Sequence, residues 1–145
     1  MFKHLLIPTD GSAASEQAIH KALELAREGN AQVTGLHVIR PFHLVSYEVD
    51  MIAETRASFE ANVHAQARGY LEVIERGAKE LGVSVDTRTV VADHPYEAII
   101  GAALDAGCDL IVMASHGRRG MQAVLLGSET QKVLTHSAVP VLVLR

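Results

Sequence analysis

Short, continuous apolar runs alternate along this chain with longer stretches in which apolar residues recur every three or four positions. The first pattern is typical of strands buried on both faces, and the second of helices with one buried face. The apolar runs predict strands at residues 4–8, 32–39, 83–91, 109–114 and 139–144. The periodic stretches predict helices at residues 14–26, 59–81, 95–106 and 128–137. This order predicts an α/β fold with a single open five-stranded parallel sheet and helices on both of its faces. It also predicts one domain over residues 1–145.

Residues with special backbone preferences support these boundaries. Pro95 suits the first position of a helix, where its missing N–H costs no hydrogen bond. Gly29–Asn30, Gly82 and Gly107 follow the periodic stretches, and a glycine or asparagine there commonly ends a helix. The 83–91 run is rich in β-branched residues and alternates, which favours a strand near an edge of the sheet.

Composition narrows the possible functions. The chain has 145 residues and a formal net charge of −4. Nucleic acids and anionic membranes bind positively charged surfaces, so neither is an expected partner. The chain opens without a signal-peptide pattern, and no apolar run reaches the roughly 20 residues of a membrane-spanning helix. A single cysteine, Cys108, cannot form an internal disulfide and is expected to be a packed residue. We therefore expect a soluble, cytoplasmic protein.

Two polar, glycine-containing segments follow predicted strands. Pro8–Ser12 (PTDGS) comes after the first strand, and Ala114–Thr130 (ASHGRRGMQAVLLGSET) begins at the end of the fourth. In an open parallel sheet, ligands bind beyond the carboxyl ends of the strands, where the direction of winding reverses. If the first and fourth strands are neighbours, both segments line the same crevice.

The second segment has the chemistry of an anion site. Gly127 and Ser128 open a predicted helix, whose free N–H groups and dipole attract negative charge, and glycine lets a phosphate approach the backbone closely. Gly117 could add N–H donors, and the Arg118–Arg119 pair could bind phosphate oxygens. Ser128 followed by Gln131 also fits a capping box, which begins a helix without any ligand. The two interpretations are compatible.

Better-known phosphate motifs fit less well. The chain has neither G-x-x-x-x-G-K-[ST] nor a G-x-G-x-x-G after its first strand, which disfavours a P-loop hydrolase or a dinucleotide-dependent dehydrogenase. Asp10 is a weak match to the phosphorylated aspartate of response regulators, because that residue follows the third strand. The PTDGS segment only faintly resembles the S-G-G-x-D-S loop of ATP pyrophosphatases, since it has one glycine.

The chain resembles the universal stress protein family over residues 3–145. The resemblance rests on its two ends. The chain begins with a strand, the PTDGS segment and a helix, and it ends with ASHG, nine further residues, GS, a helix and the VPVLVL strand. The ATP-binding branch of that family is marked by G-x-x-G, nine residues and G-[ST]. Gly117 and Gly127–Ser128 match this motif, whereas Ala114 stands at the first glycine. The resemblance implies a Rossmann-like fold of the adenine nucleotide alpha hydrolase type, and ATP as the ligand with Mg²⁺ or Mn²⁺.

The resemblance also implies a site. Asp10 would lie near the ribose hydroxyls, Val38 would offer backbone groups to the adenine edge, and Met113 would pack near the ribose or base. Gly117, Gly127 and Ser128 would hold the phosphates. The full set of implied ATP-contacting residues is Pro8, Thr9, Asp10, Val38, Met113, Ala114, His116, Gly117, Arg118, Gly127, Ser128 and Glu129.

Several positions raise specific questions. Alanine at 114 adds one methyl group, which should be tolerated unless the position needs a positive φ. Glu129 stands where the family often has valine, and its carboxylate would either repel a polyphosphate or join it through a divalent cation.

A structural hydrogen bond is the expected role of His116. Ser12 and Ser15 are expected helix caps. The eight histidines lack the spacing of metal ligands.

The last predicted strand has features that indicate contact with a partner chain. Pro140 lacks an N–H, which favours an edge position for Val139–Leu144, yet this run is very apolar. Pairing of two copies through it would cover the edge, and the resemblance implies such homodimers. The 40–50 loop is also more apolar than a free loop, and it would cover either the adenine side of the crevice or a partner surface.

These observations predict a homodimeric, ATP-binding regulatory protein of the stress response. Nucleotide contacts would favour one arrangement of the glycine loop and of residues 41–58, which would change the surface that an unidentified protein partner contacts. No residues form a convincing catalytic set. Two alternatives stay open: a dimeric scaffold of the same family that binds no nucleotide, and an ATP-using enzyme of the ATP pyrophosphatase type.

Overall fold

The computed structural model describes residues 1–41, 53–117 and 126–145. The strands are β1 (His4–Pro8), β2 (Gln32–Ile39), β3 (Val85–Val91), β4 (Leu110–Ala114) and β5 (Val141–Leu144). The helices in the described ranges are α1 (Ala13–Gly29), α3 (Ala53–Leu81), α4 (Pro95–Ala106) and α5 (Ser128–His136). All strand pairs are parallel, and the sheet order is β3-β2-β1-β4-β5. The predicted α/β class and parallel sheet are confirmed.

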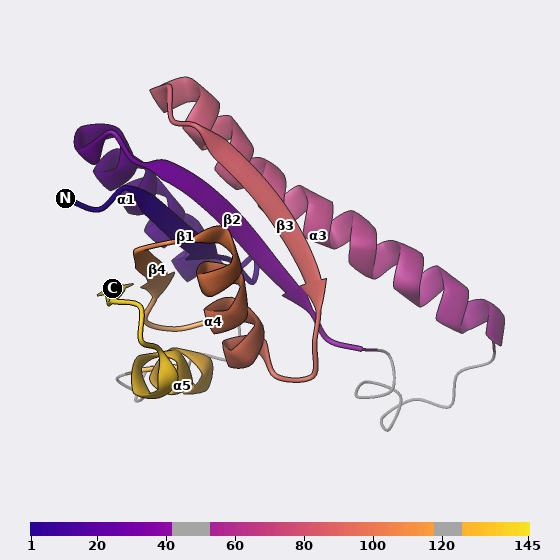
Figure 1. Ribbon diagram of the computed structural model, residues 1–145. Helices are drawn as coiled ribbons and strands as arrows, with labels where there is room; N and C mark the ends of the chain where they lie inside the picture. The colour runs from indigo at the N-terminus through magenta and orange to yellow at the C-terminus, as the bar shows by residue number, and fades with distance from the viewer. Residues whose placement is uncertain (42–52, 118–125) are drawn as a thin grey trace.

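Helices cover both faces of the sheet (Figure 1). Leu5 and Ile7 of β1 point into a core built with α1 and α3, whereas Leu6 points into a second core built with α4 and α5. All three side chains are fully buried. Because neither face of β1 meets water, its residues form a continuous apolar run instead of an alternating one.

Because β1 lies in the centre of the sheet, the order in which strands are added reverses beside it, and ligand sites of open sheets lie at such a reversal. The chain leaves β1 for β2 and β3 on one side, and then returns to β4 on the other side. Leu5 and Leu6 pair with Leu110 and Ile111. The carboxyl ends of β1 and β4 therefore lie next to each other, as the shared crevice requires.

Three predicted strands begin later than expected, and for β3 and β5 the local reason is visible. Gly82 is left-handed (φ +69°), and the Val83 N–H donates to the Ala78 carbonyl at 2.8 Å. Val83 therefore closes α3 in a Schellman-type turn, and β3 begins at Val85. The Ser137 hydroxyl bonds both backbone groups of Val139, which leaves that residue outside the ladder, so β5 begins at Val141. β4 begins at Leu110, one residue later than predicted.

The helix predicted at residues 59–81 begins earlier, at Ala53, and the helix predicted at 14–26 extends to Ala13–Gly29, whereas the predicted edge strands and helix-ending residues are confirmed. β3 and β5 are the two edge strands. Asn30 and Gly107 end α1 and α4 in left-handed conformations, and Pro95 opens α4. None of the helices in the three described ranges is long and apolar enough to span a membrane.

Candidate functional site

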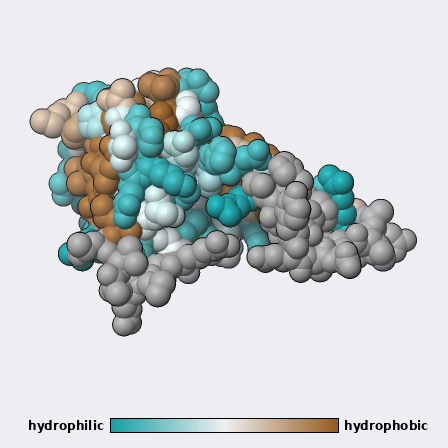
Figure 2. Space-filling view, turned by 90° about the horizontal axis from the view of Figure 1, so that it is seen from below, coloured by the Kyte–Doolittle hydropathy of each residue, from teal (hydrophilic) through white to brown (hydrophobic). Residues whose placement is uncertain are grey.

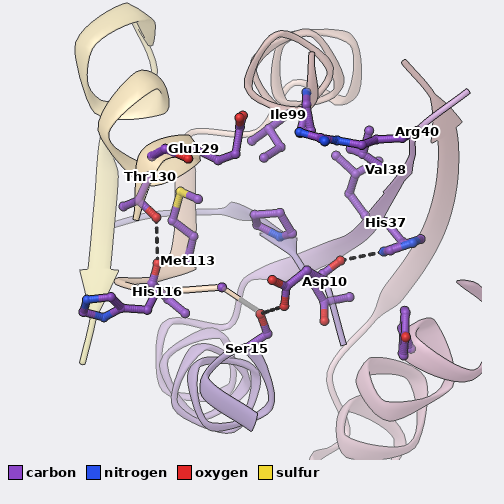
Figure 3. Close-up of a pocket in the computed structure, with 18 of the residues that line it drawn as sticks. Asp10, Ser15, His37, Val38, Arg40, Ile99, Met113, His116, Glu129 and Thr130 are labelled. Atoms are coloured by element: carbon purple, nitrogen blue, oxygen red, sulfur yellow. Dashed lines mark hydrogen bonds between the residues drawn. The ribbon is translucent and has the colours of Figure 1, made fainter. Parts of the chain in front are cut away.

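A cleft of about 460 Å³ opens beyond the carboxyl ends of β1, β2 and β4. Figure 3 shows side chains from α1, α4 and α5 reaching it from different sides. The predicted site residues that line it are Pro8, Thr9, Asp10, Val38, Met113, Ala114, His116, Gly117, Ser128 and Glu129. Gly127 packs behind this wall, and Arg118 lies outside the described residues, as does the loop at residues 42–50.

Other lining residues were not predicted. They are Ser15, Leu36, His37, Arg40, Gln66, Tyr70, Pro95, Ile99 and Thr130. Most of them come from α3, α4 and β2, elements whose apolar periodicity indicated core packing and gave no sign of a ligand. Their proximity to the cleft depends on how the elements pack, which no local motif encodes.

Asp10 is held in place by the first turn of α1. Its Oδ1 accepts hydrogen bonds from the Ser15 hydroxyl at 2.7 Å and from the Ser12 N–H at 2.9 Å. The Ser12 hydroxyl in turn accepts from the Ser15 N–H at 3.2 Å, which confirms Ser12 as the N-cap of α1. The hydroxyl of Ser15 orients the carboxylate and does not cap the helix. Charge-assisted bonds of this kind fix an acceptor in one direction.

Gly117 lies directly against this carboxylate. A Cβ built on Gly117 would overlap Oδ2 of Asp10. Gly11 is equally constrained, because it is left-handed (φ +77°) and the ring of Tyr70 covers it. Glycine at 117 therefore lets the loop after β4 approach Asp10, and glycine at 11 lets the turn after β1 pass under the Tyr70 ring.

The ends of the glycine loop meet behind the cleft. The Gly127 N–H donates to the Ser115 carbonyl at 2.6 Å. A Cβ on Gly127 would lie 3.3 Å from that carbonyl oxygen and 3.7 Å from the Gly117 nitrogen. We call this arrangement of Ser115, Gly117 and Gly127 the glycine cradle. The Thr130 hydroxyl also donates to the Ala114 carbonyl at 3.0 Å, which ties α5 to β4.

The capping box predicted for α5 is wrong. The N-cap is Gly127, which has no side chain to accept a bond, and Ser128 is already helical. The Gln131 amide donates back to the Leu126 carbonyl at 3.2 Å instead of reaching the N-cap N–H. The N-cap lies one residue before the position that a capping box at Ser128 requires, and Gly127 is held there by its bond to Ser115. The N-cap residue itself makes no side-chain cap bond, and the N-terminus of α5 faces the cleft through Ser128, Glu129 and Thr130.

Two further predictions concern Ala114 and His116. Among the described residues that are not glycine, only Asn30 has a positive φ, so alanine at 114 causes no backbone strain. A ring nitrogen of His116 lies 2.9 Å from the Ser115 hydroxyl, which confirms a structural hydrogen bond.

Glu129 connects α5 with α4. Its Oε2 accepts from the Tyr96 N–H at 2.9 Å, and its Oε1 lies 3.4 Å from the Lys132 ammonium. His94, the N-cap of α4, makes no side-chain cap bond, so Glu129 supplies from another helix the acceptor that α4 lacks. A carboxylate at this position is stabilised by the helix dipole.

The opposite wall is aromatic. Nδ1 of His37 lies 2.8 Å from the Thr9 carbonyl oxygen, which joins the ends of β1 and β2. The His37 and Tyr70 rings pack edge to face with centroids 5.1 Å apart. Val38, Met113 and Ile99 pack together as a second, apolar wall, and Figure 3 shows the Arg40 side chain beside Val38 and Ile99. A flat, largely apolar ring would fit between these walls.

The charged groups of the described cleft are few. Asp10 and Glu129 contribute carboxylates, and Arg40 contributes a guanidinium. Within the described parts of the chain, no three His, Cys, Asp or Glu side chains are grouped closely enough to hold a metal ion. A cation in this cleft would therefore need oxygen ligands from the bound molecule as well.

Known proteins share this sequence and fold. The model of the universal stress protein family matches residues 1–145. Universal stress protein MJ0531 of Methanocaldococcus jannaschii is 31% identical over 146 residues, which cover 100% of this chain and 83% of that protein. The solved structure of MJ0577, from the same organism, is 33% identical, with a TM-score of 0.83 over 99% of this chain and 96% of that one.

Two other structures with this fold were determined with nucleotides. A universal stress protein in complex with cAMP is 24% identical, with a TM-score of 0.71 over 99% of this chain and 97% of that one. An Arabidopsis thaliana family protein with AMP bound is 17% identical, with a TM-score of 0.68 over 98% and 90% of the two chains. The whole-chain match, the strand order and the position of the cleft lead to one conclusion: this chain belongs to the universal stress protein family.

Proposed function

We propose that the cleft binds ATP and that the protein acts as a homodimeric, nucleotide-dependent regulator in the stress response. The observation that carries this proposal is the glycine cradle beside the N-terminus of α5, whose N-cap residue Gly127 has no side chain. A Cβ on Gly117 would overlap Asp10, and a Cβ on Gly127 would crowd the Ser115 carbonyl, so glycine lets the backbone pack closely at the start of α5. Such a combination of close backbone approach and positive dipole suits a phosphate group.

The remaining walls suit the adenosine part of the ligand. Met113 and Ile99 would pack on the base, and backbone groups of Val38 at the end of β2 would meet its polar edge. Asp10, already oriented by Ser15, would accept from the ribose hydroxyls. The AMP and cAMP complexes of two proteins with this fold support an adenosine nucleotide as the ligand. Arg118 is proposed as a further phosphate ligand.

Regulation would follow from the location of the cradle. It fixes both ends of the segment between Gly117 and Gly127, so that phosphate contacts would favour one arrangement of this segment and of residues 41–58. A protein partner that contacts these surfaces would then distinguish the nucleotide-bound form. The nucleotide is proposed as a regulatory ligand, without a catalytic role for the cleft residues.

The edge strand β5 would form the dimer. The carbonyl oxygens of Pro140 and Leu144 accept from β4, so by alternation the backbone groups of Val141 and Val143 point towards the open edge. Leu142 is 37% exposed. Figure 2 shows hydrophobic residues gathered on the side of the molecule where the C-terminus lies in Figure 1. A second copy paired along this edge would cover both features.

The test is to heat-denature protein purified without added nucleotide and to identify the released small molecules by chromatography and mass. We expect near-stoichiometric ATP or ADP. Gly127→Val should release none, because its side chain would fill the cradle, whereas the matched variant Gly101→Val should release as much as the wild type. The space around Gly101 is open. An empty wild-type protein that gains no thermal stability from millimolar ATP with Mg²⁺ or Mn²⁺ would support the scaffold alternative.

A further inference from the structure

A second, polar groove lies between α3 and the edge strand β3. Figure 1 shows this helix and this strand running side by side in opposite directions. The groove has a volume of about 320 Å³ and shares no lining residue with the cleft beyond β1 and β4. Its lining residues are His64, Arg68, Leu71, Glu75, Thr87 and Thr89. The proposed nucleotide site uses none of them.

The strand that lines this groove has an open edge. The Ser84 carbonyl accepts a hydrogen bond from β2, and the Ala92 N–H donates one to it. By alternation, the even-numbered residues of β3 direct their backbone groups to β2, whereas Thr87 and Thr89 direct theirs outwards. No strand of the described chain pairs with this outer edge, and β3 contains neither a proline nor a bulge. Such an edge can accept a further strand.

The same two threonines supply both the open backbone groups and the hydroxyls of the groove. A strand added beside them would alternate its side chains in the same way as β3 does. Its side chains beside Thr87 and Thr89 would therefore point towards α3, about 6.6 Å apart along the strand. The groove would contact two side chains of the added strand, separated by one residue.

The two ends of the groove carry opposite charge. At one end, Oε1 of Glu75 accepts from the Thr87 hydroxyl at 2.7 Å. At the other end, Arg68 and His64 are exposed and lie one turn apart on α3. In the parts of the chain that the structure describes, neither of these two side chains has a hydrogen bond or an ion pair.

The antiparallel course of the two elements orders these charges along the strand. Arg68 and Glu75 are seven residues apart, which is about 10 Å along the helix axis. Because Glu75 bonds Thr87, moving along β3 from Thr87 to Thr89 leads from Glu75 towards Arg68. The negative end therefore lies beside Thr87, and the positive end lies towards Thr89.

We propose that β3 and this groove bind an extended segment of a partner protein as an added strand. A lysine or arginine of the segment, beside Thr87, pairs with Glu75. An aspartate or glutamate two positions away, beside Thr89, pairs with Arg68 and with the ring of His64. Main-chain hydrogen bonds along the edge supply affinity, and the two charged side chains select the segment. This interaction requires no nucleotide.

The charges of the groove favour this occupant over a second copy of β3. By alternation, β3 presents only Val85, Thr87, Thr89 and Val91 on the face that lines the groove. A second β3 would bring valine and threonine to Arg68 and no carboxylate. The open backbone groups of the same residues likewise favour a polypeptide over a small anion, which would leave the edge unpaired.

The experiment measures peptide binding by fluorescence anisotropy in the absence of nucleotide. The probes are STKTETS and STETKTS, each with an N-terminal fluorescein and a C-terminal amide, because an added strand can run in either direction. Each is compared with a version that has glutamine in place of glutamate, and with one whose three central residues carry N-methyl groups. The proteins are the wild type, Arg68→Gln and the matched control Arg76→Gln, which is exposed on α3 outside the groove. Melting temperatures show that each variant is folded.

We expect the wild type to bind one of the two charged peptides at least about threefold more tightly than its glutamine version. In Arg68→Gln this preference should fall below about 1.5-fold, whereas Arg76→Gln should keep it. N-methylation should weaken binding to all three proteins at least about tenfold, because it removes edge hydrogen bonds and holds the two strands apart.

Three results would overturn the inference. The first is that neither charged peptide shows saturable binding to the wild type up to millimolar protein. The second is binding that tolerates N-methylation, which would exclude an added strand. The third is a preference for glutamate that persists in folded Arg68→Gln. Since no nucleotide is present, each of these results leaves the proposed function of the cleft untouched.

Discussion

The carboxylate of Asp10 occupies the space that a side chain on Gly117 would need. The loop after β1 and the loop after β4 are therefore in close contact at Oδ2 of Asp10. This relationship distinguishes the two ends of the 114–117 segment: Ala114 lies at the end of a strand with a negative φ, whereas Gly117 faces Asp10.

Gly117→Ala should destabilise the protein by about 1–3 kcal/mol, because the new methyl group must displace a hydrogen-bonded carboxylate. Urea unfolding measures this change. Gly101→Ala is the control: it lies inside α4 with open space around it, and should stabilise the protein by about 0.5–1 kcal/mol. In an Asp10→Ala background the cost of Gly117→Ala should shrink, and strictly additive effects would contradict the contact.

Gly11→Ala should be more destabilising than Gly82→Ala by at least about 1 kcal/mol. Both positions are left-handed, so the backbone strain of alanine is shared. Only Gly11 has a ring over it, that of Tyr70, while the space around Gly82 is open. Thermal and urea unfolding give the two free energies. Equal costs, or a difference that persists after Tyr70→Ala, would show that the ring does not constrain this turn.

Stability should fall in acid partly through Asp109. Burial alone would raise the pKa of its carboxyl group, but N–H groups of His4 and Lys3 donate to it at 3.0 and 2.8 Å and hold the pKa below its usual range. A lowered pKa in the folded state stabilises the protein above the ordinary aspartate pKa, and this contribution is lost as the pH falls through the folded value.

Asp109→Asn should therefore reduce the free energy of unfolding most near neutral pH, and its deficit relative to the wild type should shrink below the ordinary aspartate range. Urea unfolding at a series of pH values measures both curves. For the control Asp105→Asn, at an exposed position, the free energy of unfolding should change with pH in parallel with that of the wild type. A deficit of Asp109→Asn that does not change with pH would assign it to packing instead of charge.

Val143→Pro should weaken the proposed dimer and raise its dissociation constant at least about tenfold, since proline removes an N–H at the open edge and each such bond contributes about 0.5–1.5 kcal/mol. Sedimentation equilibrium measures the association. Leu104→Ser, which removes an apolar side chain 60% exposed on α4, should leave the dimer intact. A dimer that tolerates Val143→Pro but not Leu104→Ser would place the interface on the helical face.

The fold was predictable because the residue patterns that indicate its strands and helix ends lie within each element. Both faces of β1 are buried, and so Leu5, Leu6 and Ile7 form an uninterrupted apolar run. Helix ends were readable from Asn30, Pro95 and Gly107, which have backbone preferences independent of their surroundings. The strand starts at 83 and 139 were wrong because Val83 and Val139 take part in turn hydrogen bonds that compete with the ladder.

The site was less predictable. The glycines and the residues after β1 follow a recognisable motif, but His37 and Tyr70 reach the cleft only because β2 and α3 pack beside it. The capping box failed because a tertiary bond from Gly127 to Ser115 sets the start of α5. The role of Glu129 depends on an N–H group in another helix, and no spacing within α5 predicts that partner.

The insertion of β4 beside β1 has a consequence for the order of assembly. β1, β2 and β3 are complete by residue 91, yet one edge of β1 stays unpaired until β4, Leu110–Ala114, has been added. A nascent chain that ends before β4 would carry the Asp10 side of the cleft with nothing facing it, and an apolar strand edge open to other chains. Full affinity for the proposed nucleotide would thus require that residues 110–145, about the last quarter of the polypeptide, have been synthesised and docked.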